Sequence, residues 1–414
     1  MPTVYELDAT LRSGGRSRSR TVTFVIKTSK LCNLRCRYCY EFPELGNRET
    51  VTLSQLHTMY RHIAQYYSLY PAPVNIEFVW HGGEPLLLGP NFYWTTFNDQ
   101  TNIFDTPSVS VRNFVQTNLY SLNKELLVLL KYGFDEIGVS LDLYGGLRRT
   151  LSGRDSQSKV LANMDRLKEA DIPFGCITVL SKRNIDRASQ IFRFFERAGI
   201  SFRVLPIFRG ADDQQNEPYA LSPEEVLACF RDLFELWIQS PQPIVLEPLF
   251  TYTEHVLGSY VGNNTGRYDK ADWEYIYVVN IDGLLYSYAD LYDPGFAHGN
   301  IFETPLRDLV HGCGHRKAIN AAEDRMRAAC SSCRYFGRAC SGYPMAEESP
   351  MYGEASSPER ASASEAMRCV KDRGILEYIE QRLADIGILD PALGSVKLPP
   401  KYEPRFMRVL STDA

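Results

Sequence analysis

The stretch TVTFVIKTSKLCNLRCRYCYEF, residues 21–42, joins an apolar, β-branched segment to three closely spaced cysteines. The segment 21–27 predicts a buried strand. Cys32, Cys36 and Cys39 follow it with C-x₃-C-x₂-C spacing. Structural zinc sites and ordinary iron–sulfur sites use four protein ligands, so three thiols leave one position for an external ligand. The stretch therefore predicts an open metal site at the end of a strand, with an incompletely ligated zinc ion as the alternative.

The alternation of strand and helix patterns continues to about residue 210. Parallel strands joined by right-handed helical crossovers follow from such an alternation. Six units are fewer than the eight that close a full barrel. We therefore expect an α/β fold with a partial, TIM-like (β/α)6 barrel whose site lies at the C-terminal ends of the strands. The expected strands are 21–27, 74–80, 111–117, 136–142, 174–180 and 202–208, and the expected helices include 53–70, 123–133, 158–170 and 186–199.

The character of the sequence changes after residue 210. Ser222 and Glu225 form a capping-box pattern with proline between them, which predicts a helix of about four turns. Asp282-Gly283 lies between two β-branched and aromatic runs and predicts a hairpin. The expected organisation is an N-terminal arm 1–20, a barrel 21–210, a bridging helical segment 211–262, a small domain 263–385 and a C-terminal tail 386–414.

Composition restricts the class of partner. The formal net charge is −5, with 45 basic and 50 acidic residues, so nothing indicates binding to nucleic acid or to an anionic membrane. The N-terminal residues have no signal-peptide pattern, and no uncharged apolar run reaches about 18 residues. We expect a cytoplasmic protein, and in a reducing compartment ten cysteines favour metal ligation over disulfides.

A second group of cysteines lies near the C-terminus. Cys330, Cys333 and Cys340 have C-x₂-C-x₆-C spacing, and Cys369 supplies a fourth thiol. Four thiols can close a site around zinc or around an iron–sulfur cluster, and spacing alone does not decide between them. Cys313, in the segment VHGCGHR, is a reserve ligand if one member of this set is misassigned.

The first cysteine loop, with Tyr38 before its last cysteine, resembles the cluster motif of radical S-adenosylmethionine (SAM) enzymes. The resemblance implies a [4Fe-4S] cluster whose open iron binds SAM, and radical chemistry that begins at the cofactor. FVWHGGEP at the end of the second strand resembles the GGE element of this family, which implies SAM contacts. Other strand ends, VQTN and VSLD, and the segment LRRTLSGR supply the remaining contacts. In that segment Arg149 is the expected contact, with Arg148 and Arg154 as alternatives. The expected cofactor-binding residues are Gly82, Gly83, Glu84, Thr117, Asn118, Ser140, Asp142 and Arg149.

The second cysteine group follows a radical-enzyme core and a hairpin, and so resembles the SPASM extension of enzymes that modify peptides and proteins. The match is incomplete: the hairpin has Tyr286 and Tyr288 where the full pattern has a cysteine, and position 344 is Pro344. We therefore expect one auxiliary iron–sulfur cluster, of the [4Fe-4S] type, instead of two. The x₆ spacing is similar to that of the branch that forms cyclophane crosslinks.

The resemblance implies a radical SAM maturase that abstracts hydrogen from a residue of a ribosomally made precursor peptide and forms a C–C or C–heteroatom crosslink. The substrate would be that peptide, and a flavodoxin or ferredoxin would supply single electrons. One alternative is another radical protein modification, such as sulfatase maturation. A second alternative, from a different class, is a non-catalytic zinc-stabilised module that binds RNA, which the acidic balance disfavours.

Overall fold

The computed structural model describes residues 20–207, 214–262, 276–287, 294–342, 369–403 and 405–406. Some of the residues in these expectations lie outside this part of the chain: the N-terminal arm before residue 20, Phe208 at the end of the last expected strand, Tyr288 and Pro344.

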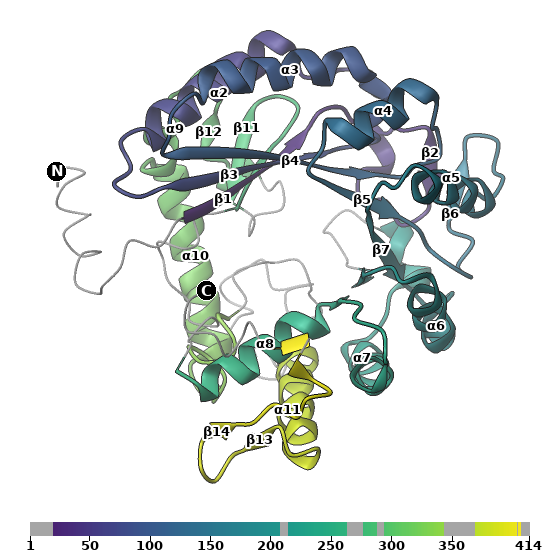
Figure 1. Ribbon diagram of the computed structural model, residues 1–414. Helices are drawn as coiled ribbons and strands as arrows, with labels where there is room; N and C mark the ends of the chain where they lie inside the picture. The colour runs from purple at the N-terminus through teal and green to yellow at the C-terminus, as the bar shows by residue number, and fades with distance from the viewer. Residues whose placement is uncertain are drawn as a thin grey trace.

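Six parallel strands build the barrel, as the alternation predicts. They pair in chain order, and each carries alternating buried and partly exposed residues. Figure 1 shows them as an arc with helices on its outer side. The fold class is confirmed. The strands are β1 (Arg20–Lys27), β3 (Val74–His81), β4 (Val109–Thr117), β5 (Glu136–Ser140), β7 (Gly175–Leu180) and β8 (Phe202–Pro206).

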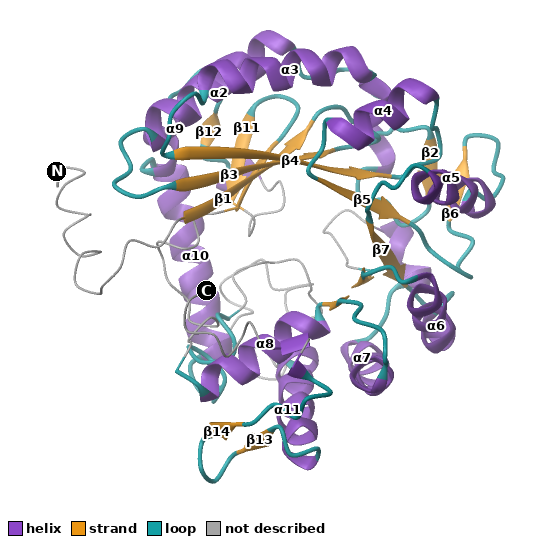
Figure 2. Cartoon of the chain, viewed as in Figure 1, coloured by secondary structure: helices purple, strands orange, loops and turns teal. Residues whose placement is uncertain are grey.

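The outer helices cover one face of this sheet. Phe24, Phe78 and Trp80 point into the layer between strands and helices, where they are fully buried. The opposite face of the same strands is only partly buried, so it lines the inside of the arc. Figure 2 shows the helices outside the orange strands. These helices are α2 (Leu53–Tyr67), α3 (Pro90–Ile103), α4 (Lys124–Tyr132), α5 (Gln157–Glu169) and α6 (Ala188–Ala198).

The bridging helix forms with the predicted cap. The Ser222 side chain accepts from the Glu225 backbone, and the Glu225 side chain accepts from the Ser222 backbone, which completes the capping box at the start of α7 (Pro223–Gln239). α7 packs on α6, and α11 packs on both α7 and α8. These helices continue the ring below the strands (Figure 1). α8 spans Leu249–Tyr260, and α11 spans Val370–Asp385.

The predicted hairpin also forms, and its pairing extends the barrel sheet. β10 (Ile276–Val279) and β11 (Leu284–Ser287) are antiparallel around Gly283, whose φ is +86°. β10 pairs in parallel with β1, with Thr23 opposite Ile276. The strand that leads into the first cysteine loop therefore has a neighbour from the C-terminal part of the chain. The order of the ten-stranded sheet is β12-β11-β10-β1-β3-β4-β5-β7-β8-β9.

Short elements complete the described structure. β2 and β6 form a two-stranded sheet beside the barrel, and β13 and β14 form another within the predicted tail. No helix of the described residues is both long and apolar enough to cross a bilayer. The remaining elements are β2 (Leu34–Cys36), β6 (Arg148–Thr150), β9 (Leu246–Glu247), β12 (Gly299–Asn300), α9 (Leu306–Val310), α10 (Cys313–Cys330), β13 (Leu389–Asp390) and β14 (Ser395–Val396), with short 3₁₀ turns at Phe42–Glu44, Pro85–Leu88, Ile185–Arg187, Gln214–Tyr219 and Pro294–Phe296.

Candidate active site

The first cysteine loop begins directly after β1, at the C-terminal end of the strands. Cys32 is buried and packs in a small apolar cluster with Leu34 and Leu45, against which Cys36 and Cys39 also lie. Burial raises the pKa of Cys32 and of Cys39 to about 12. The free thiols are therefore neutral at pH 7, and a metal that binds them displaces their protons.

The Gly-Gly-Glu segment after β3 lies directly against this loop. The Gly83 N–H donates to the Ser29 carbonyl at 2.7 Å, and the Glu84 N–H donates to the Leu31 carbonyl at 2.9 Å. A Cβ on Gly83 would lie 2.2 Å from the Leu31 carbonyl oxygen. Both glycines are therefore needed for the close approach of two backbones, and this approach fixes the cysteine loop on the end of β3.

The Glu84 side chain is buried and is held by the next strand. One carboxylate oxygen accepts from the Thr117 hydroxyl at 2.7 Å and from the Leu86 N–H at 3.1 Å, and the other accepts from the Asn118 N–H at 2.7 Å. Burial raises the pKa of Glu84, whereas these hydrogen bonds lower it. The carboxylate thus joins the ends of β3 and β4, and the oxygen that accepts from Asn118 keeps a free lone pair.

Asn118 connects this strand end to the first cysteine. Its side-chain amide donates to the Asn33 side chain at 2.8 Å and lies 3.6 Å from the Cys32 sulfur. Thr117 uses its hydroxyl for Glu84 and for the Leu119 N–H. The structure therefore brings Glu84, Thr117, Asn118 and Cys32 together, as their positions at neighbouring strand ends predict.

Ser140 and Asp142 lie at the end of β5. The Ser140 hydroxyl accepts from the Gln116 side-chain amide at 2.8 Å, on the inner face of the barrel. Asp142 is buried, and one of its oxygens accepts from the Val179 N–H at 2.8 Å while the other accepts from the Tyr38 hydroxyl. Asp142 thus ties the cysteine loop to the ends of β5 and β7.

The two arginines of β6 occupy different environments. The Arg148 guanidinium donates to the Tyr38 hydroxyl at 2.9 Å, and its backbone is paired with Cys36. Arg149, the predicted cofactor contact, donates to the Gly153 carbonyl at 3.4 Å on the same β6 turn. The geometry places Arg148, not Arg149, among the side chains that contact the cysteine loop. Adjacent residues of a strand point to opposite faces, and the sequence does not show which face is inward.

A second polar group, centred on Lys27, lies beside the first cysteine loop and was not predicted from the sequence. Lys27 ends β1, is 3% exposed, and forms an ion pair with Glu41 at 3.0 Å. It also contacts the Tyr40 hydroxyl and lies 3.4 Å from His81 Nδ1. Burial, followed by the nearby Lys27 charge, lowers the pKa of His81 to about 3. The sequence does carry a sign of this group. Lys27 and His81 alternate with the apolar residues of their strands, so both side chains should face the inside of the barrel, where they are paired neighbours on β1 and β3.

The thiols of Cys32, Cys36 and Cys39 are the kind of ligands that iron–sulfur clusters use. No group of three or more His, Cys, Asp or Glu side chains in the described ranges is placed to hold a single metal ion. A cluster has a different requirement, because each thiolate binds its own iron around a multinuclear core. The three thiols share one water-poor loop, and the Arg148 Nε beside it is buried with no partner in the described structure. Such a donor can satisfy an anionic group bound at this loop.

The four C-terminal cysteines also come together. Cys330 ends α10, Cys333 and Cys340 lie in the turns that follow, and Cys369 caps α11. Burial raises the pKa of Cys340 to about 12, with smaller contributions from Asp372 and from the neighbouring thiols. Burial also raises the pKa of Cys369, again with contributions from nearby thiols. The set is thus compact enough for its members to influence one another.

Cys313 is excluded from this set by helix length. It is the first residue of α10 and is exposed, whereas Cys330 is the last residue of the same helix of 18 residues. With a rise of about 1.5 Å per residue, their backbones lie about 26 Å apart. Cys313 therefore cannot replace a ligand beside Cys330.

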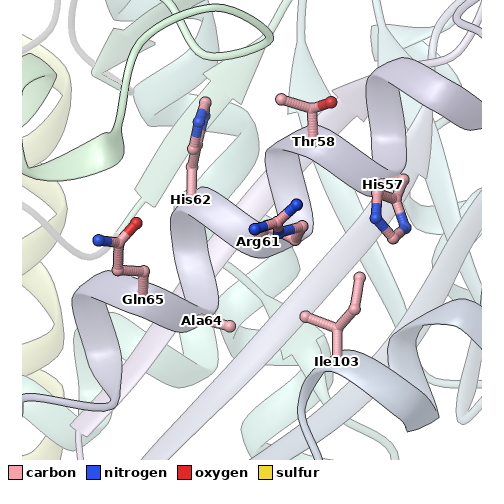
Figure 3. A pocket seen from close by; sticks show the side chains of 7 residues that line it. All are labelled: His57, Thr58, Arg61, His62, Ala64, Gln65 and Ile103. Carbon is pink, nitrogen blue, oxygen red and sulfur yellow. The ribbon is translucent and has the colours of Figure 1, made fainter.

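A separate hollow of about 770 Å³ lies on the outer layer of helices. Figure 3 shows its lining, which comes mainly from α2 with Ile103 at the end of α3. It contains His57 and His62, but none of the residues predicted to bind a cofactor. His57 contacts Asp99 at 3.0 Å, and His62 contacts the Ile301 carbonyl at 2.8 Å.

Comparison with known proteins agrees with this geometry. Residues 26–195 match the family model described as the radical SAM superfamily. This part of the chain is a radical SAM domain. The matched residues include the first cysteine loop, the Gly-Gly-Glu segment and the ends of β4 and β5. Members of this family use a [4Fe-4S] cluster and SAM, which agrees with the three thiols of the first cysteine loop.

Curated relatives of the chain include sulfatase-maturating enzymes. The chain is 26% identical over 255 residues to the cysteine-type anaerobic sulfatase-maturating enzyme of Clostridium novyi, covering 59% of this chain and 67% of the relative. It is 22% identical over 337 residues to the serine-type enzyme of Bacteroides thetaiotaomicron, covering 75% of this chain and 79% of the relative.

Solved structures share the fold over most of the chain. The enzyme anSMEcpe with bound AdoMet and the Cp18Cys peptide aligns with a TM-score of 0.69 and 18% identity, over 88% of this chain and 98% of the other. Streptococcus suis SuiB bound to S-adenosylmethionine aligns with a TM-score of 0.55 and 14% identity, over 77% of this chain and 72% of the other. The similarity of fold thus extends beyond the family match into the C-terminal region.

Proposed function

We propose that this protein is a radical SAM maturase that modifies a residue of a ribosomally made precursor peptide and forms a C–C or C–heteroatom crosslink. The observation that carries the proposal is the assembly of Cys32, Glu84 and Asn118 at the strand ends, within the radical SAM match. In support, anSMEcpe and SuiB are both described in complexes with peptides.

In this proposal Cys32, Cys36 and Cys39 hold a [4Fe-4S] cluster with one open iron. Gly82, Gly83, Glu84, Thr117, Asn118, Ser140 and Asp142 surround the proposed SAM site, and Arg148 takes the place that was expected for Arg149. When bound, the cluster and SAM supply a 5′-deoxyadenosyl radical that removes a hydrogen atom from the substrate. The protein's part is to hold these groups in a fixed, water-poor geometry through the hydrogen bonds between strand ends and cysteine loop.

Cys330, Cys333, Cys340 and Cys369 hold one auxiliary [4Fe-4S] cluster in the proposal. Formation of a crosslink removes two hydrogen atoms from the peptide: one leaves as a hydrogen atom, and the other leaves as a proton and an electron. When bound by these four cysteines, the cluster would supply an acceptor for that electron. A flavodoxin or ferredoxin is the proposed source of the electron that starts each turnover.

The first test is anaerobic reconstitution of the full chain, followed by iron and zinc counting and measurement of 5′-deoxyadenosine in the presence of SAM and dithionite. We expect about eight irons per chain, little zinc, and 5′-deoxyadenosine formation that is lost in the Cys32→Ala/Cys36→Ala/Cys39→Ala variant. A protein that holds iron at these cysteines and still forms no 5′-deoxyadenosine would refute the proposal.

Sulfatase maturation is the second candidate, because the curated relatives have this activity over up to 75% of this chain. The two activities give different products. Incubation with precursor peptides encoded beside the gene, and with a sulfatase peptide containing the target cysteine or serine, separates them by tandem mass spectrometry. A crosslinked peptide loses two hydrogens and resists fragmentation between the joined residues, whereas an oxidised cysteine or serine becomes a carbonyl that reacts with a hydrazide.

A further inference from the structure

A network of Tyr38, Asp142 and Arg148 joins the first cysteine loop to the barrel. The Tyr38 hydroxyl donates to Asp142 and accepts from Arg148 at 2.9 Å. Asp142 also accepts from the Val179 N–H at 2.8 Å, which fixes the carboxylate at the end of β5. Because Tyr38 lies between Cys36 and Cys39, one side chain of the loop holds a cation and an anion in place.

The backbone places the cation opposite the middle cysteine. In the antiparallel pair β2–β6, Cys36 is the partner of Arg148. The Arg148 guanidinium and the Asp142 carboxylate also share the Tyr38 hydroxyl, two residues after Cys36. A cation at this position favours negative charge at the loop, and an anion disfavours it.

These opposite effects apply to any change of charge at the loop. Reduction of a cluster by one electron adds a negative charge, which a nearby cation stabilises and a nearby anion destabilises. Water screens such effects weakly here, since Cys32 and Asp142 are buried and the Arg148 Nε is buried without a partner in the described structure.

We propose that Arg148 and Asp142 set the reduction potential of the cluster held by Cys32, Cys36 and Cys39, Arg148 raising it and Asp142 lowering it. Tyr38 is the positioning residue that keeps both charges at the loop. The inference rests on the cluster assignment of the proposed function, and it is independent of the peptide substrate and of the bond that is formed.

The test is a redox titration followed by electron paramagnetic resonance on the reconstituted full chain without SAM, with iron counted in each sample. To separate the two clusters, all variants are made in a Cys330→Ser/Cys333→Ser/Cys340→Ser background. We expect a lower midpoint potential in Arg148→Met and a higher one in Asp142→Asn. Tyr38→Phe releases both charges from the loop at once, and because their effects have opposite signs its shift should be smaller than either.

Two further variants distinguish charge from structure. Arg148→Lys keeps the charge and should return the potential most of the way toward that of the parent protein, even if Arg148→Met assembles poorly. Arg154→Met removes an exposed arginine of the neighbouring turn and should leave the potential unchanged. Shifts of the same sign in Arg148→Met and Asp142→Asn, or no shift at full iron content, would overturn the inference.

The outcome also separates this inference from the proposed function. If the parent protein takes up no iron at Cys32, Cys36 and Cys39, the proposed function fails and the inference fails with it. If a cluster forms and supports 5′-deoxyadenosine formation, but its potential does not respond to the two charges, only the inference fails.

Discussion

Gly83→Ala tests how the cysteine loop is attached to the barrel. A Cβ at this position would lie 2.2 Å from the Leu31 carbonyl oxygen and 2.4 Å from the Lys30 carbonyl oxygen. Real Cβ atoms essentially never approach closer than 3.0 Å, so the loop must move by at least about 0.8 Å. The atoms in the way are backbone atoms, and no side-chain rotation can relieve the contact.

The expected cost follows from the same contacts. Overpacking of a close contact costs about 1–3 kcal/mol. A shift of this size also lengthens the hydrogen bonds from Gly83 to Ser29 and from Glu84 to Leu31, each worth about 1 kcal/mol. If both bonds are lost, the total is about 3–5 kcal/mol. With an unfolding entropy of about 2.1 cal/mol/K per residue, the melting temperature should fall by roughly 3–6 °C.

The assay is iron content after anaerobic reconstitution, together with the melting temperature of the protein before reconstitution. We expect Gly83→Ala to hold fewer irons, because the displaced loop no longer presents its thiols together. Gly46→Ala is the matched control: Gly46 follows the same loop, and a Cβ there meets nothing within 4 Å. If Gly83→Ala equals the wild type in both measurements, the glycine is not required for the close approach.

Three further predictions follow from other parts of the fold. Cys369→Ser should lower the iron content from about eight to about four per chain, whereas Cys313→Ser should leave it unchanged, because only Cys369 lies beside the thiols of the C-terminal cysteine group. Equal losses of iron in the two variants would contradict this assignment. Burial, with the nearby His315 ring, lowers the pKa of His298 to about 3, so below pH 6.5 only the unfolded chain takes up this proton and the unfolding free energy should fall by about 1.4 kcal/mol per pH unit. Denaturant titrations at pH 7, 6 and 5 should show a shallower fall of the unfolding free energy in His298→Gln than in the wild type, and equal slopes would argue against the effect. Ser222→Ala removes the cap of α7 and should lower the unfolding free energy by about 1 kcal/mol in urea titration, and an unchanged midpoint would show that the cap is dispensable.

The sequence predicted the elements well because their signals are local. Short β-branched runs predicted the six barrel strands, Ser222 and Glu225 predicted the start of α7, and Asp282-Gly283 predicted the turn between β10 and β11. The pairing of β10 with β1 had no local signal, because two strands about 250 residues apart meet only through the completed fold.

The site was predictable to the level of strand ends, but not to the level of individual partners. Glu84, Thr117 and Asn118 were expected near one another because parallel strands end at one edge, and they are. The use of the Glu84 carboxylate to bind the next strand depends on the register between β3 and β4, which no motif encodes. Arg148 and Arg149 are neighbours on β6, so their side chains point to opposite faces, and the sequence does not show which face meets the cysteine loop.

The pairing of β10 with β1 has a consequence for how the chain is made. β1 gains its neighbour β3 early, but its other edge stays open until residues 276–279 are synthesised, about 195 residues after the end of β3. At about 5–20 residues per second this interval lasts roughly 10–40 s on the ribosome. During that time an apolar strand with unpaired backbone groups, followed by three reduced thiols, is available to other chains and to oxidants. Slow or interrupted translation between residues 81 and 276 should therefore lower the yield of correctly assembled protein.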